Sequence, residues 1–210
     1  MQLGRVVNLK GYSKILSFIK ENNILIILLF FFFFGFGFGI FSLNHFDGYI
    51  TYSQTRLNDF ISLRSCEDFF KIFFGSFLNN FSYIILLFIF GTCIFGVAAL
   101  PFVVFSNGLA YGSMIALLYS QYALKGIAYN AVAVLPPAAL FVAVLILAAR
   151  EAINFSLKTA SLTFPRTAPK NLCCDFKYYF ILFLKFTIAV LFSALLDAFI
   201  SCNFLSDMII

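Results

Sequence analysis

Long apolar segments alternate with short polar ones along the whole chain. The apolar segments are residues 23–43, 77–120, 131–149 and 176–204, and the 44 residues of the second contain no charged side chain. A helix needs about 20 apolar residues to cross about 30 Å of hydrocarbon. The second segment is long enough for two crossings and each of the others for one. The pattern therefore predicts an all-α integral membrane protein with about five transmembrane helices.

The distribution of basic residues predicts the orientation of these helices. With a cytoplasmic N-terminus, nine Lys and Arg residues lie inside and four outside, which satisfies the positive-inside rule. A single crossing by residues 77–120 would place residues 150–177 outside and remove this bias. We therefore expect one polytopic domain over residues 1–210 with an extracytoplasmic C-terminus. Its polar parts are a cytoplasmic tail (1–22), an outer loop with an interfacial helix (44–76) and a cytoplasmic loop (150–177).

Small and amide residues recur within the long central segment. These candidates for helix packing and turns are Asn79, Asn80, Gly91, Gly96, Asn107, Gly108 and Gly112. Asparagine near a helix start is usually a cap, and glycine in a membrane helix usually allows close packing. The sequence Ser-Asn-Gly at 106–108 predicts the hinge between the two crossings, with Pro101 as a competing hinge.

Several further segments carry local signals. Residues 12–20 have the pattern of an amphipathic helix on an anionic leaflet, and a solvated tail explains them equally well. Gly35 and Gly39 form a small-xxx-small pair that suits helix contact or arises by chance. Residues 68–79 describe an interfacial helix with one thin polar stripe, and residues 121–130 a short outer loop. Pro136, in Leu-Pro-Pro, kinks the fourth span unless the helix begins there.

Composition excludes several classes of protein. With 62% hydrophobic and 11% charged residues, the chain is not a soluble globule. The net charge of +5 comes from residues at the ends of apolar segments, so a nucleic-acid partner is not expected and the lipid bilayer is. His45 is the only histidine, and the five cysteines lack metal spacing, although Cys66 and Cys202 share a side and suit a disulfide. We expect no catalytic, cofactor-binding or metal site.

Apart from Lys177 at its start, the last apolar segment contains two charged residues, Lys185 and Asp197. A charge inside a membrane span is a functional candidate by default. Twelve residues separate them, which is about 120° around a helix, so they do not share a face. The alternative, in which each side chain snorkels to its nearer interface, stays open.

The central segment resembles a known family. Phe-Leu-Asn-Asn at 77–80, the spacing of Gly91 and Gly96, and Ser-Asn-Gly-Leu-Ala-Tyr-Gly at 106–112 are similar to the core of the stage II sporulation protein M family. Lys-Gly-Ile at 125–127 is similar to its sporulation branch, although Lys125 and Tyr129 stand where the wider family often has His-Gly and an acidic residue. The resemblance implies a membrane protein of endospore engulfment that is not itself a hydrolase. It also implies recruitment of the peptidoglycan-degrading stage II sporulation proteins D and P at the septal or engulfing mother-cell membrane.

Two functions follow from the sequence. One is a scaffold whose outer segments, 44–76 and 121–130, hold extracytoplasmic partners. The alternative is a small transporter or permease-associated subunit, with Lys185, Asp197, Asn107 and the break at 136–137 lining a polar path. The absence of an internal repeat and the small number of intramembrane charges favour the scaffold.

Overall fold

The computed structural model describes residues 23–43, 45, 47–65, 68–163 and 172–204, and these residues form helices without any strand. The all-α fold class is therefore confirmed. The elements are α2 (Asn23–Ser42), α3 (Asp47–Ser65), α4 (Phe69–Thr92), α5 (Gly96–Tyr129), the π-helix η1 (Asn130–Val134), α6 (Leu135–Thr163) and α7 (Leu172–Phe204). The predicted amphipathic segment 12–20 lies outside the described residues.

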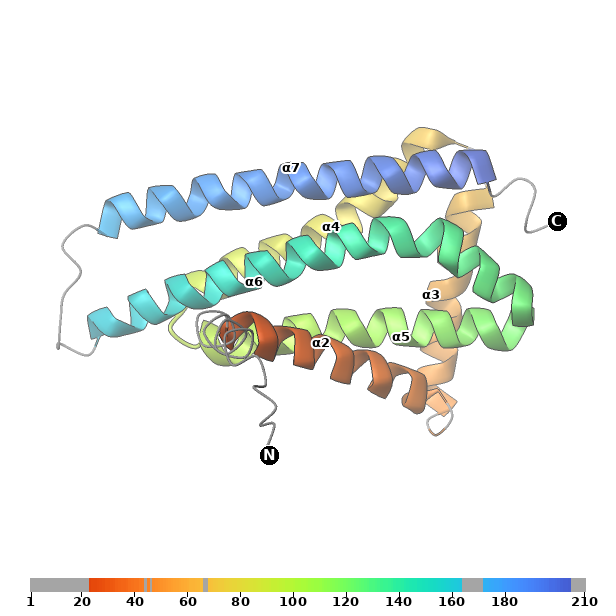
Figure 1. Cartoon of the computed structure of the whole chain (residues 1–210), viewed down its shortest axis with the longest axis horizontal. Helices are drawn as coiled ribbons and strands as arrows, with labels where there is room; N and C mark the ends of the chain where they lie inside the picture. Colours follow the sequence, from red (N-terminus) through yellow and green to blue (C-terminus); the bar gives the residue numbers. More distant parts are fainter. Residues whose placement is uncertain (1–22, 44, 46, 66–67, 164–171, 205–210) are drawn as a thin grey trace, which may run out of the picture.

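Four helical stretches are long and apolar enough to cross a membrane: Asn23–Ser42, Phe69–Thr92, Gly96–Ala160 and Asp175–Asn203. The third contains both α5 and α6, which run in opposite directions (Figure 1). The long helices are α2, α4, α5, α6 and α7, and successive ones run in opposite directions through the bundle (Figure 1). The four apolar stretches are close to the predicted count of about five transmembrane helices. One end of the bundle holds the start of α2 and the α4–α5 turn. The other holds α3, the α5–α6 bend and the end of α7.

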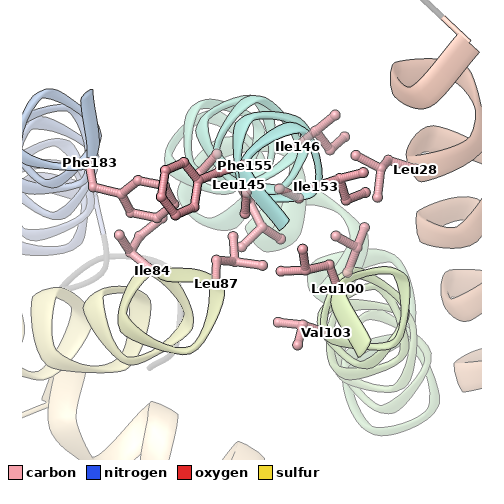
Figure 2. Close-up of a cluster of buried hydrophobic side chains, with 14 of the residues drawn as sticks. Leu28, Ile84, Leu87, Leu100, Val103, Leu145, Ile146, Ile153, Phe155 and Phe183 are labelled. Atoms are coloured by element: carbon pink, nitrogen blue, oxygen red, sulfur yellow. The ribbon is translucent and has the colours of Figure 1, made fainter. Parts of the chain in front are cut away.

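Helix α6 lies at the centre of the bundle, with α2, α4, α5 and α7 around it (Figure 2). Its buried side chains Phe141, Leu145 and Ala149 meet apolar groups from these helices, including Leu28 and Leu87. Many phenylalanines on the outside of the bundle, by contrast, are exposed. In a bilayer this apolar surface faces lipid, so the high phenylalanine content covers the outside as well as filling the core.

Helices α2 and α5 pack with their backbones close together. A Cβ atom at Gly35 or Gly39 would overlap a backbone carbonyl of α5, and one at Gly108 or Gly112 would overlap a carbonyl of α2. The contact is therefore reciprocal, with small residues on both helices at the closest points. Such approach is the usual means of helix association in lipid, where apolar burial alone gives little attraction.

The turn between α4 and α5 lies at Cys93–Phe95, so the predicted hinge at 106–108 is wrong. Asn107 and Gly108 lie inside α5 and face the bundle. An Asn-Gly pair often makes a turn in water, but a backbone in lipid must keep its helical hydrogen bonds, and here Gly108 admits α2 instead. Pro101, the competing hinge, also lies inside α5.

Two side chains hold the α4–α5 turn against the rest of the bundle. The Ser156 hydroxyl donates a hydrogen bond to the carbonyl of Cys93 at 2.7 Å. The Tyr179 hydroxyl donates to the carbonyl of Phe88 at 3.1 Å and lies against Gly91, where a Cβ would overlap it. A Cβ at Gly96 would likewise overlap the carbonyl of Phe90, so glycine allows the close backbone approach at this turn.

The connection from α5 to α6 is helical rather than a loop. The predicted loop 121–130 is wrong, because α5 continues to Tyr129 and bends sharply at Ala123 (φ 48°, ψ −126°). The π-helix follows, and α6 begins at Leu135. Pro136 follows directly on this π-helix, where the backbone is already helical, so the missing N–H groups of Pro136 and Pro137 coincide with a π-helical distortion and not with a free helix start.

The polar segments also contain more helix than the sequence pattern predicts. Residues 44–76, expected as a loop ending in an interfacial helix, contain the 19-residue helix α3, and α4 begins at Phe69. Much of the predicted loop 150–177 belongs to α6 and α7. Cys202 is a free thiol, and its expected disulfide partner, Cys66, lies outside the described residues.

Candidate binding cavity and buried ion pair

A cavity of about 640 Å³ lies under α3, between α4 and α5, with α6 and α7 contributing to its wall. Helices α4 and α5 diverge from their shared turn, and α3 crosses the open end between them (Figure 1). The connection from α2 to α4 is therefore what closes this space. Its polar lining includes Ser76, Asn79, Asn80, Tyr83, Asn107, Tyr111 and Asp197.

Asn79 and Asn80 do not cap a helix, contrary to the sequence-based expectation. They lie near the middle of α4, which runs from Phe69 to Thr92, and both line the cavity. A capping asparagine must sit at the first residue of its helix to reach the free N–H groups there. The sequence did not reveal this position because α4 begins earlier than its apolar segment.

Asn107 carries a buried carbonyl oxygen without a hydrogen-bond partner. The residue is 3% exposed, its side chain is hydrogen-bonded to Tyr83, and its Oδ1 is unpaired within the described structure. It stands eleven residues from the start of α5, or about 17 Å along the helix axis. The polar wall of the cavity thus extends to roughly half the depth of a bilayer.

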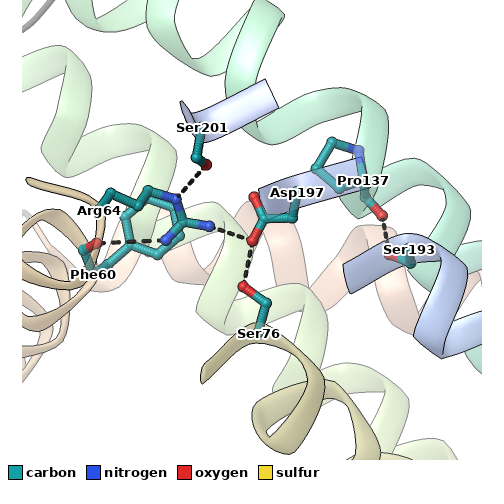
Figure 3. Close-up of polar contacts among 7 residues, drawn as sticks. All are labelled: Phe60, Arg64, Ser76, Pro137, Ser193, Asp197 and Ser201. Carbon is teal, nitrogen blue, oxygen red and sulfur yellow. Dashed lines mark hydrogen bonds and ion pairs between the residues drawn. The ribbon is translucent and has the colours of Figure 1, made fainter. Parts of the chain in front are cut away.

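A buried ion pair joins α3 to α7 at the edge of the cavity (Figure 3). Arg64 Nη2 donates to Asp197 Oδ2 at 2.5 Å, and the two side chains are only 6% and 9% exposed. The Ser76 hydroxyl donates to the same carboxylate oxygen. Arg64 also donates to the Ser201 hydroxyl at 3.2 Å and lies over the ring of Phe60. The pair and its hydrogen bonds fix α3 to the ends of α4 and α7.

Lys185, the other predicted intramembrane charge, has no such environment. Its side chain is exposed, it does not line the cavity, and it takes part in neither of the ion pairs between described residues. Lys185 and Asp197 are not brought together. The cavity thus contains one of the two predicted charges.

The opening of the cavity carries a second arginine. Arg56 Nε donates to the Tyr52 hydroxyl at 3.1 Å, and this hydrogen bond raises the pKa of the guanidinium. Asp59 is near enough to add to this effect. All three side chains lie on α3, are exposed and line the cavity.

The described residues provide no group of metal ligands. His45 is hydrogen-bonded to the carbonyl of Phe41 and stacks on the ring of that residue. The cavity walls hold amides and hydroxyls, which suit binding by hydrogen bonds, together with the Arg64–Asp197 pair and, at the opening, Arg56 and Asp59.

These features define a multi-pass α-helical membrane protein with a helix laid across one end of its bundle. Residues 14–202 match the family model of Stage II sporulation protein M, and the chain belongs to that family. It is thus a sporulation-related membrane protein, and its family is not a known enzyme family. Searches of curated proteins and of solved structures return no significant match.

Proposed function

We propose that this protein is a non-enzymatic scaffold of the engulfment step, and that α3 presents its docking surface to extracytoplasmic partners. The observation that carries the proposal is the position of α3, fixed across one bundle end by the Arg64–Asp197 pair. That end is opposite the start of α2. The positive-inside rule puts the start of α2 in the cytoplasm, so α3 faces the outside.

Helix α3 has one face buried against the bundle and another face exposed, as a docking surface for a partner requires. Ser53, Leu57 and Arg64 are buried against the bundle. Gln54 and Asn58, one helical turn apart on another face, are exposed amides. Exposed amides on a rigid element provide hydrogen-bond donors and acceptors for a protein partner. By family resemblance, the partners are the stage II sporulation proteins D and P at the septal or engulfing membrane.

Co-purification from sporulating cells tests this proposal. Partners D and P should co-purify with the intact protein and be lost from the double variant Gln54→Arg/Asn58→Arg, which changes only the outer face of α3. Asn203→Arg, an exposed amide on α7, is the matched control and should retain both partners. Retention of both partners by the double variant would show that α3 does not bind them.

A deletion strain supplies an independent test of the sporulation role. Cells without the protein should divide asymmetrically and then fail to engulf the smaller compartment. Normal engulfment in that strain would remove the proposal.

One observation favours the transport alternative, namely the polar cavity reaching the middle of α5. Against it, Lys185 lies outside that cavity, so the predicted charged path is not assembled. Solute flux through reconstituted vesicles that disappears in both Asn107→Leu and Lys185→Ala would favour transport over scaffolding.

A further inference from the structure

The polar groups of the cavity have few partners within the protein. The side chains of Asn79, Asn80 and Tyr111 make no hydrogen bond to another described residue, and Asn107 Oδ1 is buried and unpaired. Each unpaired amide or hydroxyl in an apolar environment is costly, by about 1–3 kcal/mol in proteins. Asn107 Oδ1 carries this cost because it is buried, whereas Asn79 is exposed and Asn80 and Tyr111 are half-buried and add hydrogen-bonding capacity along the same cavity. A polar guest that reaches Asn107 completes the hydrogen bonding of its oxygen.

The size and openings of the cavity limit what this guest is. A volume of about 640 Å³ lies within the range of about 300–1,000 Å³ that is usual for small-molecule sites. Lining residues on three helices are exposed, namely Tyr52 on α3, Asn79 on α4 and Ser106 on α5. The cavity therefore opens where these helices meet. A guest can enter there from water or from the surrounding lipid.

The charges of the lining balance. Arg64 is neutralised by Asp197 at 2.5 Å, and Arg56 has Asp59 beside it. With two arginines and two aspartates, the cavity carries no net charge to attract a phosphate group. The remaining polar groups are amides, phenols and serine hydroxyls, which both donate and accept hydrogen bonds. Adjacent hydroxyl groups on a neutral ligand match this set, and the tyrosine rings offer apolar faces to its C–H groups.

We propose that the cavity binds a neutral sugar, carried as the headgroup of a glycolipid or free in solution. Asn79, Asn80, Asn107 and Tyr111 bond its hydroxyl groups, and the inward side of α3 covers it. A site built to hydrogen-bond hydroxyl groups rejects analogues that lack them, because its polar groups would then stay unpaired. This function is separate from partner recruitment and does not depend on it.

Native mass spectrometry of the full-length protein in detergent micelles tests the proposal. The probes are monoglucosyl diacylglycerol, diacylglycerol with the same acyl chains, phosphatidylglycerol and free maltose. We expect the glucolipid to be retained at least about fivefold more than diacylglycerol or phosphatidylglycerol. Binding of free maltose at comparable affinity would identify the aqueous source, and binding of the glucolipid alone would identify the membrane source. Both results support the sugar chemistry.

Variants locate the binding to the cavity. Asn79→Ala removes an exposed amide and should reduce glucolipid binding at least about fivefold, as should Asn107→Leu if that variant folds. Ser82→Ala is the control, since its hydroxyl is exposed on α4 and bonds only the carbonyl of Leu78. Equal retention of glucolipid and diacylglycerol, preference for phosphatidylglycerol, or undiminished binding by Asn79→Ala would each overturn the proposal.

Discussion

Removal of the carboxylate at position 197 should release α3 from the bundle. Asp197→Asn keeps the size of the side chain but leaves the guanidinium of Arg64 buried without its counter-ion. Breaking one partner of a buried pair typically costs about 3–5 kcal/mol, because the remaining charge stays desolvated. At 1.4 kcal/mol for each factor of ten, the population with α3 undocked should rise by about 10²- to 10⁴-fold.

Cysteine labelling measures this opening directly. Leu57 is on the buried face of α3 and is 1% exposed, so a cysteine at that position reacts with a maleimide only when α3 lifts. The five native cysteines are first replaced by serine or alanine. The labelling rate of Leu57→Cys should then increase by roughly the same 10²- to 10⁴-fold when Asp197→Asn is added.

Two controls separate the ion pair from a general loss of stability. Arg64→Met/Asp197→Met removes both charges and should label far more slowly than Asp197→Asn, because an apolar pair leaves no buried charge. Lys158→Ala removes an exposed pair with Asp175, at 3.5 Å, and should change the rate little. A rate for Asp197→Asn within about threefold of the reference, less than about 1 kcal/mol, would refute the assigned role of the pair.

Three further variants and one control, Gly37→Ala, test the packing through thermal unfolding followed by circular dichroism in detergent. Gly112→Ala should destabilise the protein by about 1–3 kcal/mol because its Cβ meets the backbone of α2, whereas Gly37→Ala, with open space around it, should be neutral or stabilising; equal effects would contradict the close α2–α5 contact. Ala123→Gly should raise the midpoint, since glycine relieves about 1–3 kcal/mol of strain at φ 48°, and a lower midpoint would contradict that bend. Ser156→Ala should cost about 0.5–1.5 kcal/mol by removing one of the two hydrogen bonds that the carbonyl of Cys93 accepts, the other coming from the N–H of Gly96, and an unchanged midpoint would argue against this contact.

The sequence predicted the membrane-spanning helices well where lipid alone determines them. The expected first span, 23–43, differs from α2 (Asn23–Ser42) by one residue, because a helix in hydrocarbon ends where its apolar side chains end. The α4–α5 turn was misplaced because the local preference of Asn-Gly for a turn was weaker than the packing of Gly108 on α2. Whether Asn107 and Gly108 form a turn or stay helical depends on α2, which lies about seventy residues away in the sequence.

Most of the candidate site could not be predicted from the local sequence. Arg64 and Asp197 are 133 residues apart, so nothing in either segment indicates that they pair. Helix α3 did leave a signal, since Ser53, Leu57 and Arg64 are spaced at four and seven residues and share its buried face. The balanced charges around these residues concealed that pattern. Asn79, Asn80 and Asn107 were recognised as unusual, but their shared cavity requires the tertiary fold.

Photocrosslinking on α3 tests the central claim most directly. A photoreactive amino acid replaces Asn58, on the exposed face of α3, in sporulating cells, and a second variant carries it at Leu147, exposed on the apolar side of α6. We expect crosslinked products containing stage II sporulation protein D or P at position 58 and none at position 147. Absence of these products at position 58, or equal products at both positions, would contradict the claim that α3 holds the partners.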